Sequence, residues 1–234
     1  MRTVPQVSSS DLLTSFIQAQ SQNFVTPKYQ ALIAGNNQFV GGAGNDFLDG
    51  GAGSDVLAGE GGNDLIAGGT GVDILAGGSG ADTFLINGDP FANGVPAPAG
   101  ATGINVLNRP DVIADYTIGE DRFALDGSDL GIASLSFQQG ISSQLAGGSN
   151  ALVLLDPFPA AGAAARAIAN NPNVTADAGV FVYFNSTLGI NRLVYSQDLS
   201  DGGNISVLAN LNNQQGLAGF SNLASFTGSD FTVF

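Results

Sequence analysis

Five consecutive nine-residue units occupy residues 41–85, and they constrain the fold more than any other feature of the chain. They read GGAGNDFLD, GGAGSDVLA, GEGGNDLIA, GGTGVDILA and GGSGADTFL. Each has Gly at its first and fourth positions, Asp at its sixth and a large apolar residue at its eighth. A degenerate unit, LIAGNNQFV, precedes them at residues 32–40. Repetition at a short fixed period indicates a solenoid, in which each unit stacks on others of its kind.

Within each unit a glycine-rich half is followed by an apolar half. The first six residues suit a tight turn with positive φ angles, and the last three suit a short strand. One turn and one strand carry the chain once across the structure, so two units make one coil and each unit stacks on the next but one. We therefore predict a parallel β-roll over residues 32–85, with inward side chains at the eighth positions: Phe39, Leu48, Leu57, Ile66, Leu75 and Phe84.

Stacking places the residues at the sixth positions in two columns. One column holds Asn37, Asp55 and Asp73, and the other holds Asp46, Asp64 and Asp82. A hard cation between stacked turns would receive carboxylate oxygens and backbone carbonyls, which are the ligands that calcium prefers. We predict several bound Ca²⁺ ions, with carbonyl ligands from the second and fourth positions of the units: Gly42, Gly44, Gly51, Gly53, Gly62, Gly69, Gly71, Gly78 and Gly80.

The charge balance makes such a cation close to obligatory. No Lys or Arg lies between Lys28 and Arg109, whereas seven acids lie within residues 41–85. Two carboxylates about 5 Å apart repel by about 3 kcal/mol at an effective dielectric constant of about 20. We therefore expect the roll to be disordered without calcium. The alternative is a flexible Gly/Asp linker, but a linker does not require an apolar residue at every eighth position.

The units match G-G-x-G-x-D-x-U-x and resemble the RTX repeat family, whose nonapeptides form a calcium-binding parallel β-roll. Residues 111–126, DVIADYTIGEDRFALD, are similar to the D-x-I-x-D-F-x-x-G-x-D-x-I-x-L segment that follows the roll in serralysin-type proteases. Tyr116 and Phe123 replace the usual Phe and Ile. Asp111, Asp115 and Asp121 in this segment are candidate accessory ligands, with solvated turn acids as the alternative.

The last five residues, DFTVF, place an acid before a short apolar terminus. They resemble the uncleaved C-terminal signal of type I secretion substrates. The start of the chain, MRTVPQVSSSD, lacks the apolar core of a cleaved signal peptide. These features imply a type I exporter as a partner and a secreted location, either extracellular or at the cell surface.

The chain divides into three predicted parts. Residues 1–31 form an extension with a short helix, Asp11–Gln20, which either caps the roll or docks another subunit. Residues 32–85 form the roll. Residues 86–234 form a β-rich region that is either β-sandwich-like or an extension of the roll's sheets. The fold class is therefore mainly all-β, with strands predicted at 151–155, 180–184, 192–196 and 205–209 and a short helix at 160–169.

Composition excludes several classes of function. The net charge of −14 makes nucleic acid and anionic membrane surfaces poor partners. No run of 18 apolar residues exists, so we predict no transmembrane segment. The absence of His and Cys excludes Ser-His-Asp and Cys-His catalysis and the usual zinc sites. Only about 31 residues precede the roll, and no pair of acids stands out elsewhere, so we predict that the protein is not an enzyme.

The seventh and ninth positions of the units should face outward, and they are apolar. They are Phe47, Val56, Leu65 and Ile74 at the seventh position, and Val40, Ala58, Ala67, Ala76 and Leu85 at the ninth. Such faces must be covered, either by the C-terminal region or by neighbouring subunits. We predict a secreted calcium-binding structural protein that forms a homo-oligomer or polymer, such as a filament, sheath or surface layer. The alternative is a monomeric RTX adhesin or carbohydrate-binding module that holds a surface polysaccharide.

Overall fold

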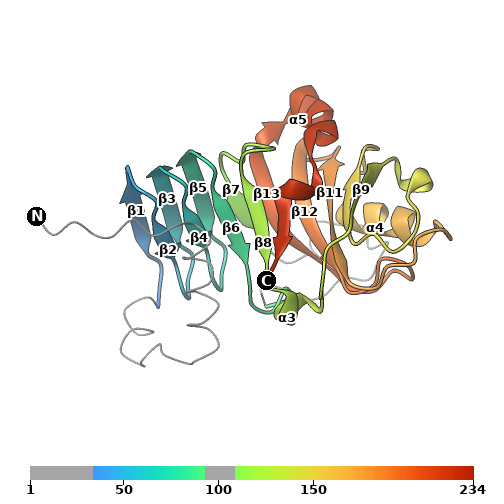
Figure 1. Cartoon of the computed structure of the whole chain (residues 1–234), viewed down its shortest axis with the longest axis horizontal. Helices are drawn as coiled ribbons and strands as arrows, with labels where there is room; N and C mark the ends of the chain where they lie inside the picture. The colour runs from blue at the N-terminus through green and yellow to red at the C-terminus, as the bar shows by residue number, and fades with distance from the viewer. Residues whose placement is uncertain (1–33, 93–108) are drawn as a thin grey trace, which may run out of the picture.

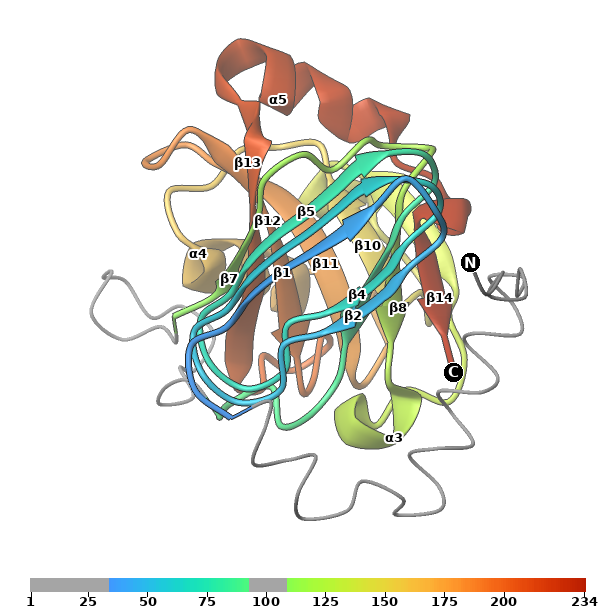
Figure 2. The same cartoon turned by 90° about the vertical axis from the view of Figure 1, so that its left-hand side faces the viewer.

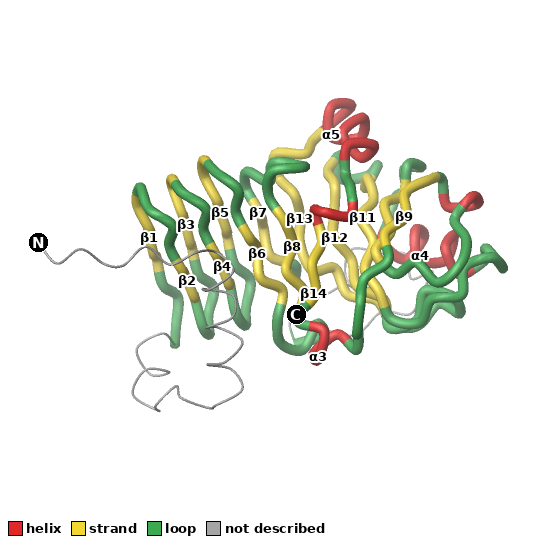
Figure 3. Tube along the Cα trace, viewed as in Figure 1, coloured by secondary structure: helices red, strands yellow, loops and turns green. Residues whose placement is uncertain are grey.

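The computed structural model describes residues 34–92 and 109–234 and shows an elongated molecule (Figure 1). The roll lies at one end, and a larger C-terminal body lies at the other. The predicted N-terminal part, residues 1–31 with the helix Asp11–Gln20, lies outside the described residues. Figure 3 shows strands in both halves and the helices in the C-terminal body.

Two parallel sheets make the roll, and each contains every second unit. The first begins with β1 (Gln38–Gly42), β3 (Val56–Gly61) and β5 (Ile74–Ser79); the second contains β2 (Phe47–Asp49), β4 (Leu65–Ala67) and β6 (Thr83–Ile86). The pairing matches Phe39 with Leu57 and Leu57 with Leu75 in the first sheet. Each unit therefore stacks on the next but one, which confirms the predicted coil of two units.

The eighth-position side chains fill the space between the two sheets. Leu57, Ile66, Leu75 and Phe84 are almost completely buried. Phe39 and Leu48, at the N-terminal end of the roll, are only partly buried. The inward positions that the repeat predicted thus form the core of the roll.

The C-terminal body continues both sheets of the roll. β7 (Asp111–Ile113) pairs with β5, and β8 (Arg122–Leu125) pairs with β6. Beyond β7 the first sheet runs through β13 (Ile205–Gln215), β12 (Ile190–Ser196), β11 (Gly179–Asn185), β10 (Ala151–Leu154) and β9 (Phe137–Gly140), to give nine strands. Beyond β8 the second sheet ends with β14 (Phe231–Val233). Of the two predicted arrangements of this region, extension of the roll's sheets is the one observed.

Short helices complete the C-terminal body. They are α3 (Gly127–Leu130), α4 (Ala161–Ala169) and α5 (Gly216–Asn222), with 3₁₀ turns at Ser142–Gln144, Leu223–Ser225 and Gly228–Asp230. α4 packs on one face of the nine-stranded sheet, where Ile168 joins Phe181 and Val194 in a second apolar core. Among the described residues no helix is long and apolar enough to span a membrane.

The junction between roll and body is closed by aromatic side chains. The ring of Tyr116 stacks on that of Phe123, with centroids 4.4 Å apart and planes 7° apart, and lies 5.9 Å from the ring of Phe226. Phe84, the last inward residue of the repeats, lies 6.0 Å from Tyr116. The body thus caps the C-terminal end of the roll's core, as stacked solenoids require.

The two outer faces of the roll are both apolar, as predicted, but they differ in how far they are covered. On the five-stranded sheet Leu65, Ala67 and Leu85 are buried in a cluster with Ala124, against which Phe234 packs. On the nine-stranded sheet Val40, Val56 and Ile74 are 60%, 37% and 47% exposed. The C-terminal residue therefore contributes to covering part of one face, on which Phe47 is still 41% exposed, while the other face presents three apolar side chains at the surface.

Candidate functional site

Backbone-to-carboxylate hydrogen bonds link the sixth positions along both edges of the roll. The N–H of Asp55 donates to Oδ1 of Asp73 at 2.8 Å, and the N–H of Asp46 donates to Oδ1 of Asp64 at 2.8 Å. Asn37 and Asp64 donate in the same way to Asp55 and Asp82. Figure 2, viewed along the roll, shows the turns of successive units overlying one another at each edge. The structure thus brings the six predicted side chains into the two expected columns.

The second carboxylate oxygen of each internal acid is buried. Among the described residues, Oδ2 has no hydrogen-bond partner in Asp55, Asp64, Asp73 and Asp82. Burying a charged oxygen without a partner is costly, and native proteins rarely leave such an atom unsatisfied. Four equivalent unsatisfied oxygens, repeated along two edges, indicate that a cation belongs beside each.

A glycine at the first position of each unit leaves room beside this oxygen. A Cβ placed on Gly50 would lie 2.6 Å from Asp55 Oδ2 and 2.6 Å from the carbonyl oxygen of Gly68, one coil further along. A Cβ on Gly41 would meet Asp46 Oδ2 and the Gly59 carbonyl in the same way. The first-position carbonyls of Gly68 and Gly77 therefore lie near the unpartnered Oδ2 atoms of Asp55 and Asp64, and that of Gly59 lies near Oδ2 of Asp46. The sequence-based ligand set, which used the second and fourth positions, missed them.

Carbonyls at the second and fourth positions point along the stack towards the next coil. A Cβ on Gly53, Gly62, Gly71 or Gly80 would collide with the carbonyl of the preceding fourth position, which belongs to Gly35, Gly44, Gly53 or Gly62 respectively. Gly69 and Gly78 have the same relation to the carbonyls of Gly51 and Glu60, and Gly42 shares their positive φ. Glu60 is the one described non-glycine residue with positive φ, at 72°. The carbonyl of Glu60 is placed like those of the second-position glycines. The predicted ligand set omitted it because that set contained only glycine carbonyls.

Asp111 and Asp121 extend the two columns beyond the repeats. Oδ1 of Asp111 accepts the N–H of Asp73 at 3.0 Å, and Oδ1 of Asp121 accepts the N–H of Asp82 at 2.9 Å. Asp121 is only 4% exposed, so it is not a solvated turn acid. The two oxygens of Asp115 accept the N–H groups of Gly77 and Gly78, both at 2.9 Å. All three acids therefore bind the last repeat turns.

Burial disfavours negative charge at these positions. It raises the pKa of Asp64, Asp73 and Asp82, against the lowering effect of the backbone hydrogen bonds, and nearby carboxylates add to the rise. By the same causes the pKa of Asp111 rises to about 7 and that of Asp121 to about 6. A cation beside these carboxylates would reverse the effect, because an opposite charge favours the ionised form.

The arrangement suits calcium better than a metal that needs side-chain ligands alone. In residues 34–92 and 109–234, no group of three or more Asp, Glu, His or Cys side chains could hold a metal ion. The candidate sites instead pair a buried carboxylate oxygen with backbone carbonyls, the hard oxygen donors that calcium takes. The identity of each ligand remains a prediction.

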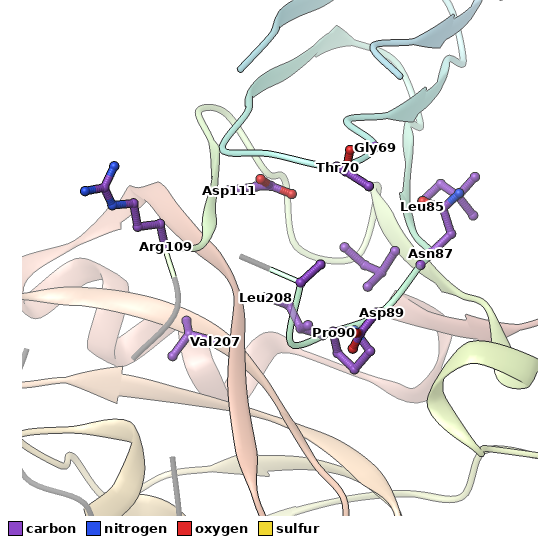
Figure 4. A pocket seen from close by; sticks show the side chains of 13 residues that line it. Gly69, Thr70, Leu85, Asn87, Asp89, Pro90, Arg109, Asp111, Val207 and Leu208 are labelled. Atoms are coloured by element: carbon purple, nitrogen blue, oxygen red, sulfur yellow. The ribbon is translucent and has the colours of Figure 1, made fainter. Parts of the chain in front are cut away.

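A separate small cavity lies where the roll meets the body (Figure 4). Its volume is about 50 Å³, and it lies between Thr70 and Asp111 on one side and Val207 and Leu208 of β13 on the other. This volume suits a few water molecules rather than a substrate. The candidate functional site is the set of stacked turns, where the buried, unpartnered carboxylate oxygens lie.

Comparison with known proteins agrees with this geometry. Residues 33–66 and 49–84 match the family described as the RTX calcium-binding nonapeptide repeat, in four copies. No curated protein matches the chain.

Among the solved structures that are similar to this chain are two from the Azotobacter vinelandii mannuronan C5-epimerase. The AlgE6R3 subunit is 24% identical, with 85% of this chain and 78% of that chain covered and a TM-score of 0.45. The AlgE6R2 subunit is 21% identical, with 85% and 92% covered and a TM-score of 0.40. Such identities concern the fold alone, and these scores carry no argument about the site.

These structures correct one prediction. We predicted from composition and chain organisation that the protein is not an enzyme. Both of these structures are subunits of an enzyme, so the prediction that the protein is not an enzyme was wrong. The likeness assigns no reaction to this chain.

Proposed function

Because residues 33–84 are RTX calcium-binding nonapeptide repeats, we propose that this protein is a secreted structural protein that folds around several calcium ions outside the cell. We further propose that it assembles into a filament, sheath or surface layer. The observation that carries the calcium-dependent folding is the row of buried, unpartnered carboxylate oxygens at Asp55, Asp64, Asp73 and Asp82.

Calcium supplies the free energy that the acidic turns lack. Extracellular sites bind calcium with dissociation constants of about 10⁻⁴ to 10⁻³ M, near the concentration outside cells and far above that inside. At a free concentration about tenfold above its dissociation constant, each ion adds about 1.4 kcal/mol to the stability of the folded state. Several ions therefore switch the roll between an unfolded intracellular chain and a folded extracellular one.

Export by a type I system is part of the proposal. The segment Asp230–Phe234 that resembles its signal is built into the fold: β14 pairs with β8, and Oδ1 of buried Asp230 accepts the N–H of Gly119 at 2.7 Å. An exporter would have to read this segment before folding. Removal of residues 230–234 should retain the protein inside a type I secretion host. The Gly119→Ala variant, which strains the same turn at φ 83° but keeps the segment, should still be exported. Normal export of the truncated chain would contradict this part.

The exposed face of the nine-stranded sheet supports assembly. In register, Val56 lies beside Ile74 and Ile74 beside Val112, with Ala58 beside Ala76 in the neighbouring row. These outward positions carry no charge in a chain whose net charge is −14, and the one charged residue of β1, β3 and β5 is Glu60, near the end of β3. Contact between two such acidic chains is least repulsive through an uncharged face. We therefore assign this face to contact with further copies of the chain.

Sedimentation with and without millimolar calcium tests the assembly. The wild type should sediment as a polymer with calcium, and the double variant Val56→Lys/Ile74→Lys should remain a folded monomer, because burying unpaired charge costs several kcal/mol. The control Ser143→Lys/Gln144→Lys places the same charges on exposed residues of the body and should still assemble. A wild type that stays monomeric at high concentration in calcium would defeat the assembly proposal.

One observation favours a second candidate, a carbohydrate-binding module. A hollow of about 290 Å³ beside Tyr116 is lined by Asn213, Gln214, Asn222 and Ser225. Uncharged amides and hydroxyls suit the hydroxyl groups of a neutral sugar. A monomeric wild type that binds a surface polysaccharide, with loss of binding in Asn222→Ala, would place this candidate first.

A further inference from the structure

The nine-stranded sheet ends in two strands, β1 and β9, each of which pairs on one side only within the described part of the chain. Figure 1 places β1 at the roll end of the long axis and β9 towards the other end. Neighbouring strands from β1 to β9 are parallel, except that β12 runs antiparallel to both β11 and β13. The two edge strands therefore point in the same direction, at opposite ends of one sheet.

β1 presents unpaired backbone groups at its free edge. The Val56 N–H donates to the Asn37 carbonyl at 2.9 Å, so residue 37 is directed towards β3. Backbone groups point alternately to the two sides of a strand, and those of Gln38 and Val40 therefore point away from the sheet. Both residues are exposed. An edge of this kind is a template for a further strand.

β9 presents the same groups at the opposite edge. The Ala151 N–H donates to the Ser136 carbonyl at 3.1 Å, so residue 136 is directed towards β10. By the same alternation the backbone groups of Phe137 and Gln139 point away from the sheet. Because β1 and β9 have the same direction, these groups match those of Gln38 and Val40 in a parallel ladder.

Neither edge carries the residues that usually prevent edge-to-edge pairing. Natural edge strands are protected by charged side chains, above all Lys, or by Pro. β1 reads QFVGG and β9 reads FQQG, with none of these. By contrast, β2, an edge strand of the five-stranded sheet, carries Asp49. In a chain with a net charge of −14, two uncharged edges are places where two copies meet with little repulsion.

We propose that β1 of one copy pairs in parallel with β9 of the next, so that the nine-stranded sheet continues from copy to copy. Neither copy has to be reversed, because the two strands share one direction. Phe39 and Phe137 become neighbours in this ladder. Both are partly buried and pack against the same apolar core, so the pair extends that core across the contact.

This edge contact rests on the proposed assembly and explains how it can grow. A face that contacts its own copy closes into a dimer, whereas contact between two different surfaces gives a filament when it does not close into a ring. The exposed face around Val56 and Ile74 supplies the first contact, and the two edges supply the second. A ladder this short is marginal by itself, so the edges join dimers that the exposed face has already formed.

Proline at an edge tests the contact while leaving the hydrogen bonds inside the sheet in place. Val40→Pro removes the N–H that faces the free edge of β1, and Gln139→Pro does the same at β9. In millimolar calcium each variant should sediment as a dimer, whereas the wild type sediments as a polymer. The matched controls Val40→Thr and Gln139→Thr keep the N–H groups and should still polymerise. A polymer in either proline variant, or none in either threonine control, overturns the edge contact.

A mixture of the two proline variants shows whether the contact joins two different edges. The Val40→Pro protein keeps a free β9 edge, and the Gln139→Pro protein keeps a free β1 edge. Dimers of the two variants should therefore polymerise when mixed, although neither does so alone, and this rescue also shows that both are folded. Variants that remain dimers when mixed overturn the pairing of β1 with β9. A wild type that stays monomeric in calcium overturns the proposed assembly itself.

Discussion

The backbone N–H of Asp64 donates to Oδ1 of Asp82 at 2.8 Å, across a sequence separation of 18 residues. Oδ1 of Asp64 in turn accepts the N–H of Asp46 at 2.8 Å. One carboxylate oxygen therefore holds the stack together, while the other, Oδ2, remains without a partner among the described residues. In each internal acid of the column, Oδ1 therefore accepts a backbone N–H of the neighbouring turn, and Oδ2 is left to bind a cation.

Replacement of Asp64 should affect calcium binding more than replacement of any residue at the end of a column. In Asp64→Ala both carboxylate oxygens are lost, so the two calcium sites on either side of residue 64 in the column should each be lost or weakened. Asn37 carries no charge and lies at the N-terminal end of its column, so Asn37→Ala should weaken one site at most. Calorimetric stoichiometry measures the difference. Equal losses in the two variants would contradict the column.

Removal of calcium should unfold the roll but not the whole protein. The body has its own apolar core, in which Leu152, Phe181 and Val194 are buried, and this core contains no acidic column. In chelator, amide hydrogens of residues 38–86 should exchange rapidly, while those of β11 and β12 stay protected. Restoring millimolar calcium should protect both. Unchanged protection of the roll in chelator would show that calcium is not needed for its fold.

Glycine should be required where a carbonyl of the next turn approaches. Gly69 has φ 91°, and a Cβ there would collide with the carbonyl oxygen of Gly51. Gly69→Ala should therefore destabilise the calcium-bound protein by about 2 kcal/mol or more, from the positive φ and the collision together. Gly44→Ala is the matched control, since no described atom lies within 4 Å of a Cβ there and its φ is not positive. Its change should stay within about 0.5 kcal/mol in chemical denaturation.

Acid should favour refolding of the roll in chelator, where the roll is otherwise unfolded. Burial raises the pKa of Asp111 to about 7 and of Asp121 to about 6, so the folded state binds these protons more tightly than the unfolded chain does. This contribution is fully present below about pH 4, and it is lost as the pH rises through 6 and 7. The β-sheet circular dichroism signal in chelator should therefore be larger at pH 5 than at pH 8.

In saturating calcium the trend should reverse, because protons compete with the ion for the same carboxylates. Circular dichroism in chelator and differential scanning calorimetry in calcium, each at both pH values, measure the two trends. A roll that gains no β-sheet signal on acidification in chelator would contradict the effect of these buried acids.

The repeat by itself determined the roll. A nine-residue period with one turn and one strand leaves a single way to stack, so the positions of Leu57, Leu75 and the two acidic columns follow from counting. These are relations between equivalent residues at a constant separation, which local geometry repeats at every coil. The carbonyl ligands were predicted less well, because the direction of a carbonyl depends on turn geometry that composition does not specify.

The relations that break this period were decided by the tertiary structure. Asp111 and Asp121 join the columns at separations of 38 and 39 residues instead of 18, so no count of units places them there. Phe234 packs against the roll because β14 pairs with β8, more than 100 residues earlier in the chain. Such contacts form when a sheet edge or an aromatic cluster is buried by a segment that is distant in the sequence. They depend on packing between distant segments, so a local sequence pattern does not predict them.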